Sequence, residues 1–291
     1  YDIFRFNKKA NYDVENNTTD LEKPLDEYLK SYGEAFKERY LLPMGAAIWS
    51  TPSDKMNAFP TRTFLQFFKN HGLLGVTTQH QWLTVSNGSV NYVNKIKQHI
   101  SGEIFLDSNI IGARREEEGI VLIAKDGKTK HYDKVVFAMH APQAIEMLED
   151  ITHTEKNVLS CFSYKRNDAL LHNDKSALYP DKDIYAAWNY KNNEDTNTVT
   201  LSYWINRLQN LHSDKAYFVS LNEINQLDNV IEKITYEHPQ FNLRAINAQG
   251  LHKEISGVNN TYFAGAYWRY GFHEDGLWSA NEIAKDFGCA L

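Results

Sequence analysis

The stretch TYFAGAYWRYGFHEDGLWSANEIAKDF, residues 261–287, decides the fold class. It opens with a short apolar run over 261–264, typical of a strand, that stops at Gly265. After a loop, apolar residues recur at helical spacing from Asp275, and Gly288 is well placed to close that helix in a left-handed conformation. Such a glycine-bounded strand end before a helix start lets the backbone approach a flat or anionic ligand, although an ordinary strand–loop–helix packing unit has the same pattern.

The rest of the chain alternates between helical and extended patterns. Expected helices cover residues 24–40, 60–70, 89–100, 142–150 and 222–234, with another after the capping-box pattern of Thr152 and Glu155. Expected strands cover residues 82–85, 104–106, 110–114, 119–124, 132–139, 161–164, 184–190, 198–205 and 217–221. Residues 11–20 are expected to form a polar loop, and Asp126-Gly127 a hairpin turn. The sequence therefore predicts a mixed α/β fold of the α+β kind.

Composition narrows the class of protein. The 291 residues, 42% hydrophobic and 23% charged, predict a packed core in one large domain or two ordinary ones. A formal charge of −6 argues against a general nucleic-acid surface. No apolar run has the length of a membrane span, and no signal sequence leads the chain. The two cysteines have no paired spacing, so a reduced, cytoplasmic setting is expected.

Several chemical motifs are absent from the sequence. It contains no G-x-S-x-G elbow, no Walker loop and no H-E-x-x-H helix. The 11 histidines never take a convincing ligand spacing, so no metal site is expected. No glycine lies two residues from another, so the dinucleotide fingerprint G-x-G-x-x-G is also missing.

Two segments carry a resemblance to a known family: PMGAAIWS (residues 43–50) and GFHEDG (residues 271–276). With VVFAMHAPQAIEML and LSYWINRLQNL, they resemble a bacterial branch of the flavin-containing amine oxidase superfamily, the predicted NAD/FAD-binding proteins. The likeness runs from about Tyr28 to the end. Members begin with a strand, a glycine-rich loop and a helix, so the chain resembles the C-terminal two-thirds of such a protein, and FAD is expected in the full-length protein rather than in this piece.

The resemblance implies a two-domain fold in which the chain crosses between domains. A partial FAD-binding domain would use residues 81–142 and 247–291. A substrate domain with a mixed sheet and flanking helices would use residues 1–80 and 143–246. A surface left uncovered by the missing part makes self-association possible.

The resemblance also implies cofactor-binding residues, which are Ile110, Ala138, Gly265, Ala266, Asp275, Gly276 and Leu277. Ile110 would meet adenine through its backbone, although a plain core isoleucine fits the same position. Gly265 and Ala266 would lie beside the ribityl chain; many members have an acidic residue at position 266. The last three would meet the pyrimidine edge of the flavin through backbone N–H groups at a helix start, where the partial positive charge stabilises an anionic flavin.

Substrate-side residues follow from the same resemblance, and the candidates are Trp188, Tyr190, Tyr203 and His238. Because successive strand residues point to opposite faces, Tyr203 and its neighbour Trp204 cannot both face a substrate. Each of these aromatic residues fits core packing as well as a cavity. No catalytic residue is identified.

The function that the resemblance implies is an FAD-dependent oxidoreductase that moves a hydride from a small or lipid-like substrate to flavin. Two alternatives stay open. One is a flavin-dependent isomerase or desaturase of an apolar chain, and the other is a binding scaffold without catalysis. Nothing in the residues identifies an amine as the substrate.

Overall fold

The computed structural model describes residues 1–49, 53–75, 80–81, 83–178, 184–193, 198–223 and 225–289. The chain divides into two compact units, each built from two segments. Unit 1 comprises residues 1–103 and 165–238, and unit 2 comprises residues 104–164 and 239–291. The substrate domain predicted over residues 1–80 and 143–246 and the partial FAD-binding domain predicted over residues 81–142 and 247–291 have other bounds than these units. The substrate and cofactor roles of the two parts remain predictions.

Unit 1 begins with helices. Their bounds are α1 Asp2–Asn16, α2 Leu25–Tyr28, α3 Glu34–Phe36, α4 Leu42–Trp49, α5 Ser53–Met56, α6 Thr61–Asn70, α7 Val90–His99 and α10 Ile205–Leu208. The polar loop expected over residues 11–20 is wrong, because α1 continues to Asn16. Buried Asp13 accepts hydrogen bonds from Lys9 Nζ, one turn earlier in α1 (2.6 Å), and from Tyr28 Oη of α2 (2.7 Å). Tertiary contacts thus override a weak local preference.

The single helix expected over residues 24–40 is broken. Gly33 lies between α2 and α3 with extended backbone angles (φ −67°, ψ 149°), and its N–H donates to Asp2 Oδ2 at 3.0 Å. A π-helical turn over Lys37–Leu41 then leads into α4. The apolar residues of this segment have helical spacing on both sides of Gly33. Glycine has a low helix propensity, however, and the N–H of Gly33 bonds to Asp2 of α1 rather than to a carbonyl of its own helix.

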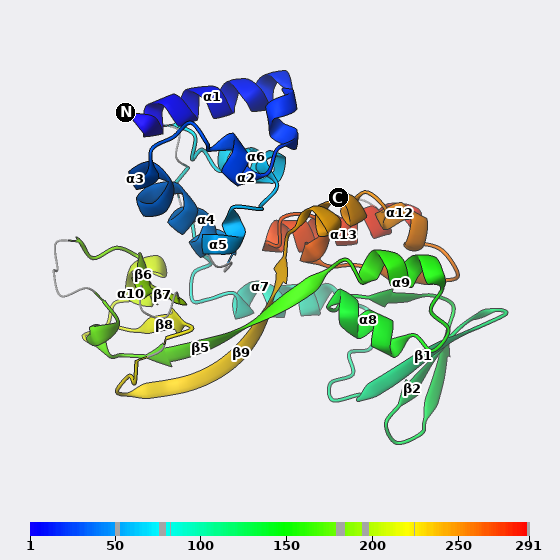
Figure 1. Cartoon of the computed structure of the whole chain (residues 1–291). Coiled ribbons are helices and arrows are strands. Elements are labelled where there is room, and N and C mark those ends of the chain that lie inside the picture. The colour runs from blue at the N-terminus through cyan, green and yellow to red at the C-terminus, as the bar shows by residue number, and fades with distance from the viewer. Residues whose placement is uncertain are drawn as a thin grey trace. The chain divides into compact units, whose positions relative to one another are not determined.

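A five-stranded sheet completes unit 1, in the order β6-β7-β8-β5-β9. Its strands are β5 Ser163–His172, β6 Trp188–Asn193, β7 Thr198–Trp204, β8 Phe218–Leu221 and β9 Val230–Gln240. Figure 1 shows β5 and β9 as long neighbouring strands. The helix expected over residues 222–234 is wrong: Asn222 and Asn229 take left-handed backbone angles (φ 54° and 55°), and the β-branched residues after them favour a strand.

Unit 2 begins with an antiparallel meander. Its strands are β1 Ile110–Glu116, β2 Gly119–Ala124 and β3 Thr129–Tyr132, followed by β4 Val135–Phe137. The Asp126-Gly127 hairpin is confirmed, with Gly127 at φ 82°. No strand forms over residues 104–106 or over the described residues 83–85, so those two expectations are wrong; residue 82 lies outside the described part.

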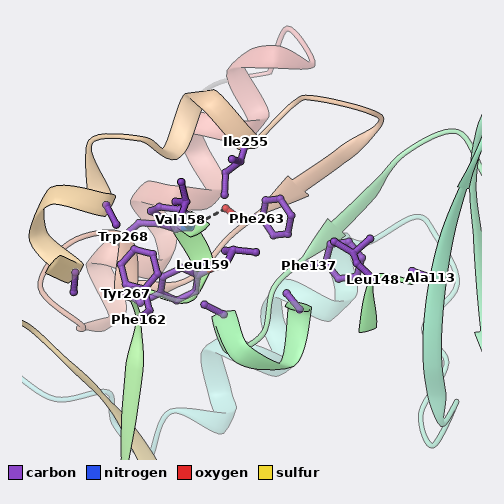
Figure 2. Close-up of a cluster of buried hydrophobic side chains, with 14 of the residues drawn as sticks. Ala113, Phe137, Leu148, Val158, Leu159, Phe162, Ile255, Phe263, Tyr267 and Trp268 are labelled. Carbon is purple, nitrogen blue, oxygen red and sulfur yellow. Dashed lines mark hydrogen bonds between the residues drawn. The ribbon is translucent and has the colours of Figure 1, made fainter. Parts of the chain in front are cut away.

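The second half of unit 2 places a buried parallel strand pair beside helices. The bounds are α8 Ala141–Met147, α9 His153–Leu159, α11 Leu243–Gln249, α12 His252–Ile255, β10 Thr261–Phe263 and α13 His273–Asp286. The capping box of Thr152 and Glu155 is confirmed at the start of α9. β10 pairs in parallel with β4, and the rings of Phe137 and Phe263 stack with centroids 5.7 Å apart. These rings belong to the buried cluster in Figure 2, which includes Trp268.

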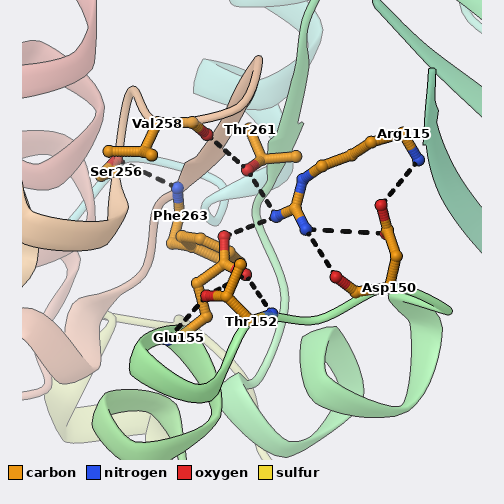
Figure 3. Close-up of polar contacts among 8 residues, drawn as sticks. All are labelled: Arg115, Asp150, Thr152, Glu155, Ser256, Val258, Thr261 and Phe263. Carbon is orange, nitrogen blue, oxygen red and sulfur yellow. Dashed lines mark hydrogen bonds and ion pairs between the residues drawn. The ribbon is translucent and has the colours of Figure 1, made fainter. Parts of the chain in front are cut away.

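One buried arginine links three elements of unit 2 (Figure 3). Arg115 of β1 forms an ion pair with Glu155 of α9 and donates from Nη2 to Thr261 Oγ1 of β10 at 2.9 Å. Its Nη1 donates to the backbone carbonyl of Asp150 at 3.1 Å. The Arg115 and Glu155 side chains are only 9% and 2% exposed. This arginine therefore fixes the meander to the strand that leads into the C-terminal turn.

No helix within the described ranges is long and apolar enough to cross a membrane.

Candidate functional site

The candidate site begins where β10 ends. Residues Ala266–Trp268 form a 3₁₀ turn directly after Gly265, and α13 starts five residues later. The N–H of Gly265 donates to Ser279 Oγ (2.9 Å), and that hydroxyl donates to the carbonyl oxygen of Gly276 (2.8 Å). The strand end and the first turns of α13 are thus held together by one buried serine.

The carbonyl group of Phe263 anchors the base of this turn. It accepts hydrogen bonds from Trp268 Nε1 (3.0 Å) and His252 Nε2 (2.8 Å), as Figure 2 shows for the tryptophan. A carbonyl oxygen has two lone pairs, so both are used. Because a carbonyl only accepts, His252 carries its hydrogen on Nε2. Burial lowers the pKa of His252, which keeps the ring neutral and the arrangement intact.

Asp275 caps the start of α13. Its carboxylate accepts from the N–H of Phe272 (2.9 Å) and lies 3.7 Å from Arg269 Nε, while burial raises the pKa of Asp275. The N–H groups of Asp275 and Gly276 both donate to the Phe272 carbonyl, at 3.0 and 3.2 Å. Helical geometry leaves the preceding N–H groups, those of His273 and Glu274, without a partner inside the helix. These two are therefore better placed than Asp275 or Gly276 to donate to a ligand.

A surface hollow of about 410 Å³ lies at this turn. It is lined by Ala266, Gly271, Phe272, His273, Gly276 and Leu277. Three predicted cofactor residues, Ala266, Gly276 and Leu277, thus lie around one space. A Cβ added at Gly276 would meet no described atom within 4 Å, so a flat group could approach that backbone.

Two predicted residues of the same turn lie outside the hollow's lining. Asp275 is buried and points into the protein. Gly265 lies against a buried aromatic ring: a Cβ there would be 2.3 Å from Tyr267 Cε1. Sequence reasoning missed Gly271 and Phe272 as lining residues, although both belong to the distinctive GFHEDG segment.

The remaining cofactor candidates lie at two further places in unit 2. Ala138 follows β4 directly, and the Ala264 N–H donates to the Phe137 carbonyl at 3.0 Å, so Ala138 lies beside the end of β10. Carboxyl ends of parallel strands are common ligand sites. Ile110, at the start of β1, lines a different hollow of about 520 Å³ together with Leu122 and other residues.

Three predicted substrate residues share one face of the sheet in unit 1. Trp188 and Tyr190 are two positions apart on β6, and Tyr203 of β7 pairs directly with Trp188. The rings of Trp188 and Tyr203 meet edge to face with centroids 5.2 Å apart. Burial raises the pKa of Tyr203 to about 12, so its hydroxyl stays protonated near neutral pH. Trp204 points to the opposite face.

The fourth candidate belongs to the same face. Tyr203 pairs with Val219 of β8, which pairs with Leu171 of β5. Asn167, four residues before Leu171, shares that face by strand alternation. His238 of β9 contacts it: Asn167 Nδ2 lies 2.8 Å from His238 Nδ1. The sheet thus presents all four predicted substrate residues on one side.

A serine–histidine cluster on the opposite face resembles a nucleophile with its base. His172 Nε2 lies 2.8 Å from Ser220 Oγ, which lies 2.6 Å from Ser202 Oγ. However, His172 Nδ1 accepts from the N–H of Asp174 (3.2 Å), so its hydrogen is on Nε2 and it cannot take a proton there from Ser220. All three side chains are buried. This cluster is structural, and the described residues contain no grouping suited to a metal ion.

Stability is expected to fall as the pH falls below about 6.5, because burial lowers the pKa of both His172 and His252. The pKa of each histidine is lower in the folded protein than in the unfolded chain, so the unfolded chain takes up protons first as the pH falls. Each histidine therefore contributes its full stability only above its unfolded pKa, and this contribution is lost as the pH decreases towards the folded pKa. In His252→Gln, whose amide can still donate to Phe263, the melting temperature should change less between pH 7.5 and 5.5. The exposed-residue control His153→Gln should keep the wild-type slope; an unchanged slope in His252→Gln would contradict the expectation.

Comparisons with solved structures agree with this fold. A cyclohexylamine oxidase from Brevibacterium oxydans has 11% sequence identity and a TM-score of 0.66, over 99% of this chain and 75% of that one. A UDP-galactopyranose mutase has 11% identity and a TM-score of 0.64, over 98% and 73%. A fatty acid isomerase from P. acnes has 13% identity and a TM-score of 0.62, over 93% and 67%.

These likenesses show the fold, because identities of 11–13% carry no specific function. The predicted mixed, amine-oxidase-like fold is therefore confirmed. No protein-family model and no curated protein matches the chain significantly. Structural neighbours that include an oxidase, a mutase and an isomerase leave the reaction itself open.

Proposed function

We propose that the chain forms the substrate side and part of the cofactor side of an FAD-dependent oxidoreductase that moves a hydride from a small or lipid-like substrate to flavin. The observation that carries the proposal is the hollow at the start of α13, where Ala266, Gly276 and Leu277 meet. Unit 2 would take the cofactor role and unit 1 the substrate role. A cytoplasmic setting belongs to the same proposal.

The residues of the turn suit a flavin ring. Ala266 and Gly276 add only one side-chain carbon between them to the lining, and the N–H groups of His273 and Glu274 at the start of α13 can donate to a carbonyl oxygen or an anionic nitrogen. The positive end of the α13 dipole favours a negative charge there. When bound, flavin supplies the hydride acceptor, and the protein orients the substrate and excludes water.

The aromatic face of unit 1 supports the substrate half of the proposal. Trp188 is 39% exposed at a sheet edge and contacts Tyr203, so an apolar group could pack against both. The protonated Tyr203 hydroxyl would act as a hydrogen-bond donor rather than as a base. Such a surface recognises apolar bulk and does not select an amine.

The test uses the product of the complete reading frame. We expect the absorbance of oxidised flavin, bleached anaerobically by a substrate and restored by an electron acceptor. Product analysis separates the alternatives, since an isomerase returns its substrate at the same oxidation state. A colourless protein that binds no added FAD would reject the proposal and favour a scaffold.

A purified chain of residues 1–291 is expected to carry no stoichiometric FAD. The reason is the absence of a glycine-rich phosphate loop from its sequence, and each lost charge-assisted hydrogen bond costs about 1.5–3 kcal/mol. The flavin content after gel filtration measures this. A yellow preparation with one flavin per chain would contradict it.

A further inference from the structure

A chain of amide groups ends at His238. Asn222 lies just after β8, Asn167 on β5 and His238 on β9, and their side chains follow one another in hydrogen-bond contact. Asn167 is fully buried and belongs to the face of the sheet that carries Trp188 and Tyr203. The direction of each hydrogen bond can be deduced from the backbone groups at the ends of the chain.

The first fixed point is the N–H of Asp168, which can only donate. It lies 3.2 Å from Asn222 Oδ1, so the oxygen of that amide must face it. The Asn222 amide nitrogen then points to Asn167 Oδ1, at 2.8 Å. The backbone carbonyl of Asn222 has its own contact, with Thr200 Oγ1, so the side chain is not needed there.

The second fixed point is the carbonyl of Lys165, which can only accept. It lies 3.1 Å from Asn167 Nδ2, so the nitrogen assignment of Asn167 follows from two independent neighbours. The other hydrogen of that NH₂ group points to His238 Nδ1, 2.8 Å away. A donor at this position requires Nδ1 to accept, and the hydrogen of a neutral His238 must therefore be on Nε2.

We infer that Asn222 and Asn167 are positioning residues that hold His238 as the Nε2–H tautomer. Any hydrogen-bond partner at Nε2 must then be an acceptor. If His238 serves the substrate, which rests on the proposed function, it selects a substrate with an oxygen acceptor such as a carboxylate, carbonyl or hydroxyl. A protonated amine, which only donates, is disfavoured at this position.

The tautomer is measured by long-range ¹H–¹⁵N correlation on histidine-labelled protein at pH 8, where a histidine of ordinary pKa, about 6.5, is neutral. His238→Gln identifies the signals of His238 among the 11 histidines. The wild type should show a protonated Nε2 and an unprotonated Nδ1. A protonated Nδ1 would overturn the inference.

Two variants test the relay, that is, the hydrogen-bonded series of side chains Asn222, Asn167 and His238. In Asn167→Asp the carboxylate only accepts, so Nδ1 of His238 should gain a proton. Asn222→Asp removes the donor to Asn167 Oδ1 and sets a carboxylate oxygen against that acceptor, which favours turning the Asn167 amide, while the Lys165 carbonyl opposes the turn. The fraction of His238 protonated at Nδ1 should therefore rise without becoming complete, although Asn222 does not touch His238. If His238 keeps its wild-type tautomer in both variants, the positioning role is wrong.

His172 is the internal control. Its Nδ1 accepts from the backbone N–H of Asp174, which neither substitution alters, so its Nε2–H signals should stay unchanged and show that the sheet is folded. The measurement requires no flavin. If the product of the complete reading frame binds no added FAD but shows the expected tautomers, the proposed function is rejected and the positioning role of the two asparagines stands; if it binds FAD but shows the wrong tautomer, the reverse holds.

Discussion

Replacing Arg115 with methionine is expected to lower the free energy of unfolding by about 3–5 kcal/mol, the usual cost of breaking a buried ion pair on one side. The substitution leaves the Glu155 carboxylate, 2% exposed, without its cation. It also removes the donors to Thr261 Oγ1 and to the Asp150 carbonyl. Figure 3 shows these contacts, and their loss is expected to weaken the packing of β1 against α9 and β10 together.

The neighbouring arginine supplies a matched control. Arg114 is on the same strand, but its side chain is 52% exposed and its ion-pair distances to Glu116 and Glu149 are 3.5 and 3.9 Å. Arg114→Met should change stability by less than about 1 kcal/mol, since exposed pairs contribute little. Urea unfolding measures the free energy of unfolding of both variants and of the wild type. Equal losses at the two positions would show that burial of Arg115 is not what matters.

A double variant that recovers part of the lost stability provides a second test of the buried ion pair. In the double variant Arg115→Met with Glu155→Gln, no uncompensated charge stays buried, while the glutamine can still accept from the N–H of Thr152 at the start of α9. The double variant should therefore be more stable than Arg115→Met alone. A double variant that is less stable would place the main contribution in the Glu155 cap rather than in the ion pair.

This arginine also illustrates a limit of sequence reasoning. Arg114 and Arg115 begin a mixed run of charged residues, RREEE, that reads as a solvated surface. Strand alternation distinguishes the two arginines, but only contacts with Glu155 and Thr261, 40 and 146 residues away, decide which one is buried. Local patterns carry no information about partners so far apart along the chain.

Elements with strong local signals were predictable, and those without were not. The strand at Thr261, the helix near Asp275 and the Asp126-Gly127 hairpin follow from apolar spacing and turn residues. The first residues of β9 were mistaken for part of a helix, because Val230, Ile231 and Ile234 also fit a period of 3.6. Residues 230–237 are all exposed, so no alternation of apolar and polar residues marks the strand. Two left-handed asparagines before β9 were the overlooked signal.

Some residues of the candidate site could likewise be predicted from the sequence, and others could not. Position-by-position resemblance picked out Ala266, Gly276 and Leu277, which lie around one hollow. It could not tell that Asp275 is turned inward to close the helix, since a carboxylate at that position suits a cap and a ligand site equally. Nor could it find the amides that orient His238, because their contacts span 55 and 71 residues.

Gly276→Leu is expected to weaken FAD binding at least tenfold in the product of the complete reading frame, which corresponds to about 1.4 kcal/mol. A leucine side chain would fill the hollow at the point where a flat ring is proposed to approach. The apo-protein should be as stable as wild type or slightly more so. No described atom lies within 4 Å of the added Cβ, and leucine favours a helix over glycine by up to about 1 kcal/mol.

Gly288→Ala is the matched control, because it changes a glycine next to the other end of α13 and its Cβ also meets no described atom within 4 Å. Gly288 has a left-handed backbone (φ 72°), which costs alanine about 1–2 kcal/mol. This variant should melt earlier and bind FAD normally, the opposite of Gly276→Leu. Fluorescence titration of FAD and thermal melts of both apo-proteins measure the contrast. If Gly276→Leu binds FAD as tightly as wild type, the start of α13 only packs against the turn, and the flavin does not bind in this hollow.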